Sequence, residues 1–538
     1  MSRGLVRPGR GVVLTLALGA LLGRGGIAAT GPFESLQTLV ASDAGDFDRF
    51  GVSVALSGDR AVIGAFTAQG AAGQVGAAYV FRLVNGSWAQ EEKIVPFDAE
   101  DGQHFGVSVA IEGDLIAVGS PSDNNAGGNV AGAVYLYRRA GGSWLLEEKL
   151  LASDGSTLAH FGTAVALSGG LLVAGARSAD GGGVPNTGAV YIYSFDGASW
   201  MEDQILHPGD PTPGQEMGIS VALSGTLLVA GAHDDELGNG AGAAYVFESD
   251  GVSFTQIQKL LGSDTGPGDR LGSSVDIQPP VVVVGSLNGG GAYVFRNVGG
   301  AWNFETKLVA PDLRAHYGGF CSLDGNRIAL GEPEFDGGRG GVHLWKRSGG
   351  VWGDFETVTG DVSDPNAMTG SSLDSEAGML LAGSYTDSPG GVREAGSVSF
   401  FRSRCDTVHV QSLSILLTGT APVLQRTCRV VLIGGRPRLF CTSMRVGTNY
   451  TLAGEALLLD QDGAPLPGAE VDLTVSISGS FRRRTVVSDP IGGVRLSLGT
   501  FYVPKNRSRR VTLSVRDVRK PGFTFDRKGS ILRTSRDL

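Results

Sequence analysis

The sequence predicts an all-β protein, a seven-bladed β-propeller followed by a small β-sandwich. The stretch from Phe105 to Tyr137 contains short apolar runs that alternate with small residues and are separated by Gly-rich turns, which is typical of strands. The stretch recurs along the chain with a period of roughly 45 to 56 residues and four strands per repeat. The repeats are too dense in strands for a helical solenoid. A propeller blade is the unit that fits this period.

Three landmarks define each repeat. The first is a large residue followed by Gly, at Phe50, Phe105, Phe161, Met217, Leu271, Tyr317 and Thr369. The second is the closing strand, which contains Tyr79, Tyr135, Tyr191, Tyr245, Tyr293, His343 and Ser399. The third is an aromatic residue before a fourth strand, at Trp88, Trp144, Trp200, Phe254, Trp302 and Trp352. The seventh repeat lacks a fourth strand and the N-terminus carries one too many. We therefore expect residues 36–41 to complete the seventh blade and close the ring, although the degenerate last repeats leave six or eight blades open.

The ends of the chain differ from the repeats. Arg3, Arg7 and Arg10 precede an apolar run and then small residues, which predicts a signal peptide over residues 1–30, with a short membrane anchor as the alternative. The mature chain is expected to lack a transmembrane segment, and its destination to be the cell envelope or the extracellular space. The propeller then covers residues 31–404. Residues 405–538 hold 20 Lys and Arg against 10 Asp and Glu, a net charge of +10, which leaves −20 for residues 1–404 and indicates a second domain.

Short strand-like runs predict that residues 405–520 form a β-sandwich, and residues 521–538 read as a basic tail. The turn-rich stretch Asp462-Gly463-Ala464-Pro465-Leu466-Pro467-Gly468-Ala469 resembles bacterial immunoglobulin-like modules. In the same region, a two-residue turn at Gly434-Gly435 would place Cys428 opposite Cys441, within disulfide range. Two reduced thiols are the alternative. Cys321 and Cys405 have no evident mate.

The repeat resembles the FG-GAP repeat of integrin alpha propellers and of bacterial secreted proteins. The resemblance rests on the Phe-Gly pairs, on residues 117–121, 173–176 and 229–232 in the second strand, and on Gly-Ala-Val-Tyr at 132–135 and 188–191. It covers residues 33–402 and implies a propeller that serves in cell adhesion. Integrin-type repeats often carry an Asp-rich calcium loop between their first two strands, but those turns lack the necessary carboxylates here. The calcium sites of the family therefore do not carry over.

Acidic residues gather instead in two sets of loops that open on one face of a propeller. We expect this face to bind a ligand, with Ca²⁺ as a possible cofactor, because loops on a rigid scaffold commonly carry function. The alternative is a solvated surface that keeps the protein soluble. The candidate ligand or metal residues are Asp123, Asn124, Asn125, Asp180, Asp234, Asp235 and Glu236.

Catalytic motifs are not evident in the sequence. His104, His160 and His316 occupy one repeat position and are expected to be structural, and His233 stands beside Asp234 without a clear partner. The sequence contains no nucleophile elbow, zinc-protease motif or phosphate loop, and it lacks the aromatic and basic interleaving of nucleic-acid binders. The sequence therefore predicts a non-catalytic, extracytoplasmic binding or adhesion protein with a protein or carbohydrate partner. The alternatives are a structural scaffold of the envelope and a hydrolase or lyase that acts in the propeller funnel.

Overall fold

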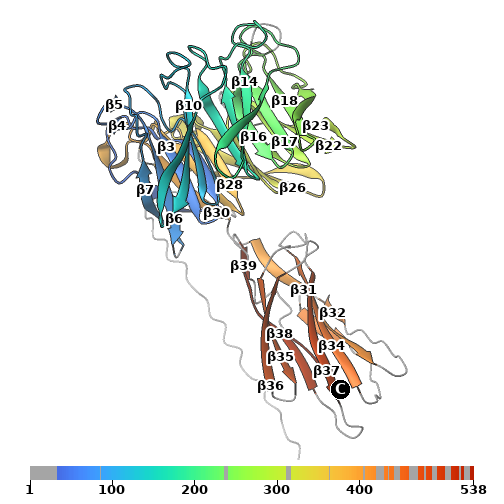
Figure 1. The fold of residues 1–538 in the computed structure, drawn as a ribbon. Coiled ribbons are helices and arrows are strands. Elements are labelled where there is room, and N and C mark those ends of the chain that lie inside the picture. The colour runs from blue at the N-terminus through green and yellow to red at the C-terminus, as the bar shows by residue number, and fades with distance from the viewer. Residues whose placement is uncertain are drawn as a thin grey trace, which may run out of the picture.

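The computed structural model describes residues 33–403, except for 85, 236–239, 310–316 and 363, and the strand backbones between residues 406 and 537. Within residues 33–403, seven four-stranded antiparallel sheets fan around one axis (Figure 1), which confirms the seven-bladed propeller. No helix in the described part of the chain is long and apolar enough to span a bilayer.

Each blade uses four strands in the order of the chain, except the seventh. Blades 1 to 3 consist of β2 (Phe50–Ser57), β3 (Arg60–Ala65), β6 (Ala77–Val84) and β7 (Ser87–Ile94); β8 (Ser108–Glu112), β9 (Leu115–Ser120), β10 (Ala133–Ala140) and β11 (Ser143–Leu150); β12 (Phe161–Ser168), β13 (Leu171–Ala176), β14 (Ala189–Phe195) and β15 (Trp200–Leu206). Blades 4 and 5 consist of β16 (Met217–Ser224), β17 (Leu227–Ala232), β18 (Ala243–Ser249) and β19 (Phe254–Leu260); β20 (Leu271–Gln278), β21 (Val281–Ser286), β22 (Gly291–Val298) and β23 (Ala301–Val309). Blades 6 and 7 consist of β24 (Cys321–Asp324), β25 (Arg327–Glu332), β26 (Gly341–Ser348) and β27 (Val351–Val358); β28 (Ser372–Glu376), β29 (Met379–Ser384), β30 (Ser397–Ser403) and β1 (Phe33–Leu39).

The N-terminal strand closes the ring, as the sequence predicts. Strand β1 pairs antiparallel with β30, from Phe33 opposite Ser403 to Leu39 opposite Val398. It begins earlier than the expected residue 36, because Phe33 is buried in the apolar cluster between blades 6 and 7 and its N–H donates to Glu356. The pairing of β1 with β30 thus completes the seventh blade with the N-terminal strand and closes the ring.

The cores lie between the blades. Each second strand is almost wholly buried because a neighbouring sheet covers each of its faces, so it reads as a continuous apolar run. Val62 and Val80 of blade 1 share one apolar cluster with Phe105 and Tyr135 of blade 2, whose ring centres lie 5.3 Å apart in an edge-to-face arrangement. The recurring aromatic-Gly and Tyr landmarks are therefore the contacts of one blade with the next.

Glycine is required where adjacent backbones touch. The Gly106 carbonyl approaches Gly64 of the preceding blade so closely that a Cβ at Gly64 would overlap it. The same relation holds between Gly162 and Gly119. These close approaches explain why the repeat keeps Gly in the middle of a strand, where it otherwise weakens a sheet.

The described loops contain four short elements of secondary structure. They are β4 (Gln69–Gly70), β5 (Gly73–Gln74), the single turn α1 (Phe335–Gly338) and the 3-10 turn η1 (Pro389–Gly391).

The C-terminal region is described only as strand backbone. It comprises β31 (Asp406–Gly419), β32 (Arg429–Ile433), β33 (Arg436–Phe440), β34 (Asn449–Leu459), β35 (Glu470–Ile477), β36 (Ser480–Val487), β37 (Gly493–Tyr502), β38 (Arg510–Arg519), β39 (Phe523–Phe525) and β40 (Arg533–Asp537). Two four-stranded sheets form, in the orders β37-β34-β31-β39 and β36-β35-β38-β40. Strands β39 and β40 fall in the stretch expected to be a tail. The immunoglobulin-like sandwich stays a prediction.

Candidate functional site

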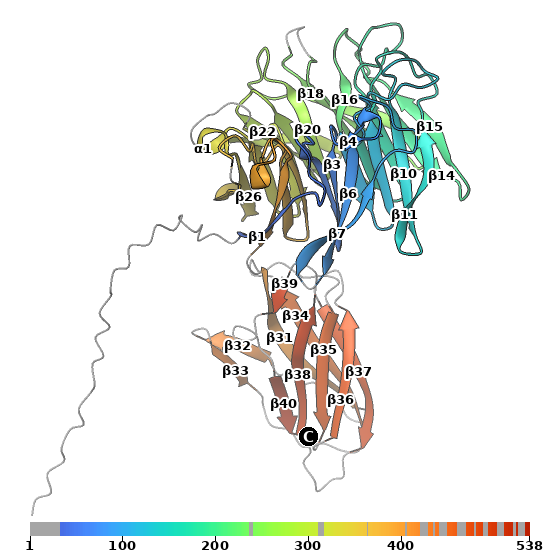
Figure 2. The same cartoon turned by 90° about the vertical axis from the view of Figure 1, so that its left-hand side faces the viewer.

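The loops between second and third strands and those between blades emerge at the same end of the propeller (Figure 2). We call this end the loop face; it carries residues 40–49, 66–76, 95–107, 121–132, 151–160, 177–188, 207–216, 233–235, 240–242, 261–270 and 385–396. The opposite end, the turn face, carries the short turns between first and second strands, such as residues 113–114 and 225–226. Of the predicted ligand residues, Asp123, Asn124, Asn125, Asp180, Asp234 and Asp235 belong to the loop face.

Most acids of the loop face are bonded to the scaffold itself. In blade 5, Asp264 accepts hydrogen bonds from Tyr293 and Lys307 at 2.6 and 2.9 Å, and these bonds hold its pKa below the ordinary value. The ammonium group of Lys307 also lies 4.8 Å from the centre of the Tyr293 ring. The same Tyr-Asp-Lys unit recurs as Tyr79, Asp43 and Lys93; Tyr135, Asp98 and Lys149; Tyr245, Asp210 and Lys259. These acids anchor the loops to the third and fourth strands.

Asp123 and Asp235 occupy equivalent positions in blades 2 and 4, and both are 2% exposed. Asp123 accepts hydrogen bonds from Gln103, Tyr135 and Lys149. Asp235 is bonded in the same way by Gln215, Tyr245 and Lys259. Their carboxylates are therefore engaged inside the blade rather than presented to solvent.

The other predicted ligand residues shape their own loops. The Asn125 amide donates to Asp123 and to the Gly132 carbonyl, and Asn124 donates to Glu100. Asp180 is exposed and accepts a bond from the N–H of Asn186. Glu236 lies outside the described residues.

A ring of strained residues marks the entrance of the central channel on the loop face. The residue before each large residue-Gly pair has a left-handed backbone with φ between 55° and 58°. It is found at Arg49, His104, His160, Glu216, Arg270 and Met368. Arg, Glu and Met adopt this conformation only at a cost, and His, although more common there, still lacks the freedom of Gly. His316, at the corresponding position of blade 6, lies outside the described residues.

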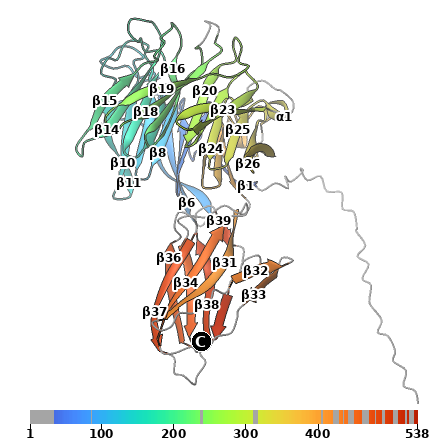
Figure 3. The ribbon, with the colours of Figure 1, turned by 90° about the vertical axis from the view of Figure 1, so that its right-hand side faces the viewer.

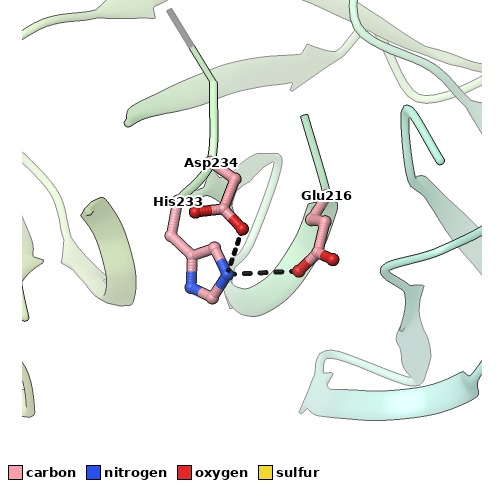
Figure 4. Close-up of side chains that lie close together, drawn as sticks. All are labelled: Glu216, His233 and Asp234. Atoms are coloured by element: carbon pink, nitrogen blue, oxygen red, sulfur yellow. Dashed lines mark hydrogen bonds and ion pairs between the residues drawn. The ribbon is translucent and has the colours of Figure 1, made fainter. Parts of the chain in front are cut away.

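One group of side chains at the entrance converges on a point. Strands β16 and β17 pair with Met217 opposite Ala232, so Glu216 and His233 flank the same end of the pair. His233 Nε2 lies 3.1 Å from Glu216 Oε2 and 3.4 Å from Asp234 Oδ2 (Figure 4). The three ligand atoms lie within 4.8 Å of one another. Of the predicted residues, only Asp234 belongs to this group, which combines the nitrogen and oxygen donors of a metal site.

Two arginines, Arg270 and Arg177, lie near this group. Arg270 Nε lies 3.4 Å from Asp234 Oδ1, the oxygen that does not face His233. The hydrogen bond to His233 lowers the pKa of Glu216, so the carboxylate is ionised at neutral pH. Burial and the charge of Arg177 lower the pKa of His160, so its imidazole is neutral there. The sequence does not reveal this grouping, because Glu216 and His233 meet only through the pairing of β16 with β17.

The first strands line a central channel of about 450 Å³, and in Figure 3 β8, β20 and β24 lie between the outer β15 and β26. Asp276, Ser322 and Asp374 of blades 5 to 7 stand at one repeat position, where blades 1 to 4 have alanine. Burial raises the pKa of Asp276 to about 6 and that of Asp374 to about 7. These two residues are absent from the predicted site, although aligning the repeats would have shown carboxylates replacing alanine.

The cysteines add no second site in the described part of the chain. The Cys321 thiol is buried beside Ser274, and burial raises its pKa to about 12, which makes it unreactive. Strands β32 and β33 pair with Ile433 opposite Arg436, the expected register. Cys428, Cys441 and Cys405 lie outside the described residues, and the disulfide stays a prediction.

Comparison with known protein families finds matches within the propeller. Residues 33–81, 88–137, 144–193, 200–247 and 254–295 each match the FG-GAP repeat. Five repeats of the propeller are thus similar to the FG-GAP repeat. Each match begins in the fourth strand of one blade and ends in the third strand of the next, so the repeat spans a blade boundary. Most of blades 6 and 7 lies outside the matched residues, and these blades complete the ring in the structure. No match was found among curated proteins.

Proposed function

We propose that this chain is a non-catalytic, extracytoplasmic binding or adhesion protein. Its FG-GAP propeller contacts a protein or carbohydrate partner with the loop face, around the entrance of the channel. The observation that carries this proposal is the ring of left-handed residues at that entrance.

Backbone strain at the entrance supports this assignment. A left-handed backbone costs a non-glycine residue about 1–2 kcal/mol, and glycine would remove that cost. The same repeat keeps Gly wherever backbones touch, yet at this position it uses Arg, His and Glu. Strained residues that persist against a cheaper alternative are commonly found at functional sites. We therefore assign the side chains of the entrance to ligand contact, while the Tyr-Asp-Lys units hold the loops in place.

The location of the protein is part of the proposal. The predicted signal peptide over residues 1–30 would export the chain, and a resemblance to integrin-type propellers favours an adhesive role. A multi-blade face of this kind suits a partner that makes many shallow contacts.

The test is retention of the labelled full chain on an array of glycans and purified matrix proteins. We expect at least one probe to retain the wild-type chain. The double variant His160→Ala and Arg177→Ala at the entrance should lose retention. The matched variant Asp114→Ala and Thr226→Ala, on the turn face, should keep it. Equal retention of both variants would contradict the proposed face, and no retention by any probe would favour a structural scaffold.

A hydrolase or lyase acting in the channel is the second candidate. It is favoured by Asp276 and Asp374, because carboxyl groups with pKa values of about 6 and about 7 are suited to general acid-base catalysis. Turnover of p-nitrophenyl glycosides or esters that Asp374→Asn abolishes would support it. Turnover that survives both Asp276→Asn and Asp374→Asn would exclude these residues as the catalysts.

A further inference from the structure

We propose that Glu216, His233 and Asp234 form a binding site for one zinc ion at the entrance of the channel. This inference concerns a metal site and stands whether or not the loop face binds a macromolecular partner.

Two of the three spacings between the ligand atoms fit zinc. Zinc bonds to imidazole nitrogen and carboxylate oxygen are about 2.0–2.2 Å long, which places the ligands of a tetrahedral ion about 3.3–3.5 Å apart. His233 Nε2 lies 3.1 Å from Glu216 Oε2 and 3.4 Å from Asp234 Oδ2. The Glu216 and Asp234 oxygens lie within 4.8 Å of each other, so a bound ion would draw these two carboxylates together.

The scaffold under these ligands is rigid. Glu216 immediately precedes β16, and His233 immediately follows β17, so the last pair of a β-ladder holds the two side chains together. Metal sites built on regular elements are more accurately positioned than sites built on loops. Asp234 is in turn oriented by Arg270, which contacts Oδ1 and leaves Oδ2 directed at His233.

Blade 4 departs from the repeat at these positions. The described residues at the position of His233 in the other blades are Phe66, Pro121, Arg177, Leu287, Pro333 and Tyr385. An acid is present at the position of Glu216 only in blade 4 among the described blades. The combination is thus specific to one blade and not a by-product of the fold.

The donor set also selects the type of ion. Calcium prefers six to eight oxygen ligands, whereas one imidazole with two carboxylates is a donor set for zinc. Three protein ligands leave one tetrahedral position open, as in zinc sites that bind an exogenous group.

The experiment is a Zn²⁺ titration of the full chain after removal of metals with EDTA, followed by calorimetry and by measurement of bound metal. We expect wild type to bind Zn²⁺ and to gain thermal stability from it. His233→Ala and Glu216→Gln should each weaken binding by about tenfold or more. His207→Ala, a loop-face histidine outside the group and outside the ring of left-handed residues, should bind as wild type does.

Thermal unfolding of each variant without metal separates loss of the site from loss of the fold, and Glu216→Gln preserves side-chain shape if His233→Ala unfolds. The inference is wrong if wild type takes up no Zn²⁺. It is equally wrong if folded Glu216→Gln and His233→Ala chains bind Zn²⁺ with wild-type affinity and stoichiometry, which would place the ion on other groups of the chain.

Discussion

The Ser372 hydroxyl donates a hydrogen bond to the Gly51 carbonyl at 2.7 Å and so joins the last blade to the first. The same bond links successive blades along the channel, from Ser53 to Gly106, Ser108 to Gly162 and Ser220 to Gly272. Each bond requires a carbonyl to approach a neighbouring strand closely. The glycine in the second strand makes that approach possible, and this relation leads to a first prediction.

Gly119→Ala should destabilise the propeller strongly. The new Cβ would overlap the Gly162 carbonyl and the Ser108 hydroxyl, which bond to each other. We expect a loss of about 3 kcal/mol or more in the free energy of unfolding. Gly113→Ala, in an open turn with φ of 59°, should cost only about 1 kcal/mol. Urea denaturation measures both, and equal losses would refute the packing explanation.

Asp123→Ala should destabilise the propeller, because Asp123 accepts buried hydrogen bonds inside blade 2. Removal of the carboxylate leaves Gln103 without its carboxylate acceptor in a buried place and leaves Tyr135 and Lys149 with Asp98 alone. We expect a loss of about 2–4 kcal/mol. Asp180→Ala, in the exposed loop of the next blade, should cost less than about 1 kcal/mol. A comparable small loss for both would show that the Asp123 network carries little stability.

The two channel carboxylates should make stability depend on pH. Burial raises the pKa of Asp276 to about 6 and that of Asp374 to about 7, from 3.8. The folded state therefore binds protons that the unfolded state releases. The stabilisation is complete below about pH 4 and is lost as the pH rises through about 6 to 7.

The measurement is denaturation at about pH 5 and about pH 8 for wild type and for the double variant Asp276→Asn and Asp374→Asn. Wild type should lose more stability between the two pH values than the double variant. Ser322→Ala, at the same repeat position in blade 6, should keep the wild-type difference. Identical pH dependence in wild type and the Asn variant would show that neither carboxyl has a raised pKa.

His160→Gly should leave the propeller as stable as wild type or more stable by up to about 1 kcal/mol, because Gly relieves the strain at φ of 58°. His160→Ala keeps the strain and should not show this gain. Both variants should lose retention on an array probe that holds wild type. If Gly destabilises the protein by more than Ala does, the His160 side chain serves the fold and the strain argument fails.

The sequence predicts the ring better than the site, for a physical reason. Phe105 and Tyr135 lie in the apolar cluster between blades 1 and 2, and Phe50 with Tyr79 and Phe161 with Tyr191 lie in the equivalent clusters. Because the same contact recurs from blade to blade, its residues recur periodically in the sequence. The sequence predicts that loop acids such as Asp123 bind a ligand, because it does not show the hydrogen bonds from Tyr135 and Lys149. Those bonds form only in the folded blade. Glu216 and His233 are brought together by strand pairing, which local patterns do not reveal. Asp276 and Asp374 are the exception, since they could have been recognised as departures from a position otherwise held by alanine.

The most direct test of the proposed binding face is hydrogen exchange of the full chain with and without the probe that retains it best on the array. The account predicts that the probe protects loop-face segments, residues 46–50, 101–105, 157–161 and 213–217, and leaves the turns at residues 113–114 and 225–226 unchanged. Protection confined to those turns, or to residues 406–537, would contradict it.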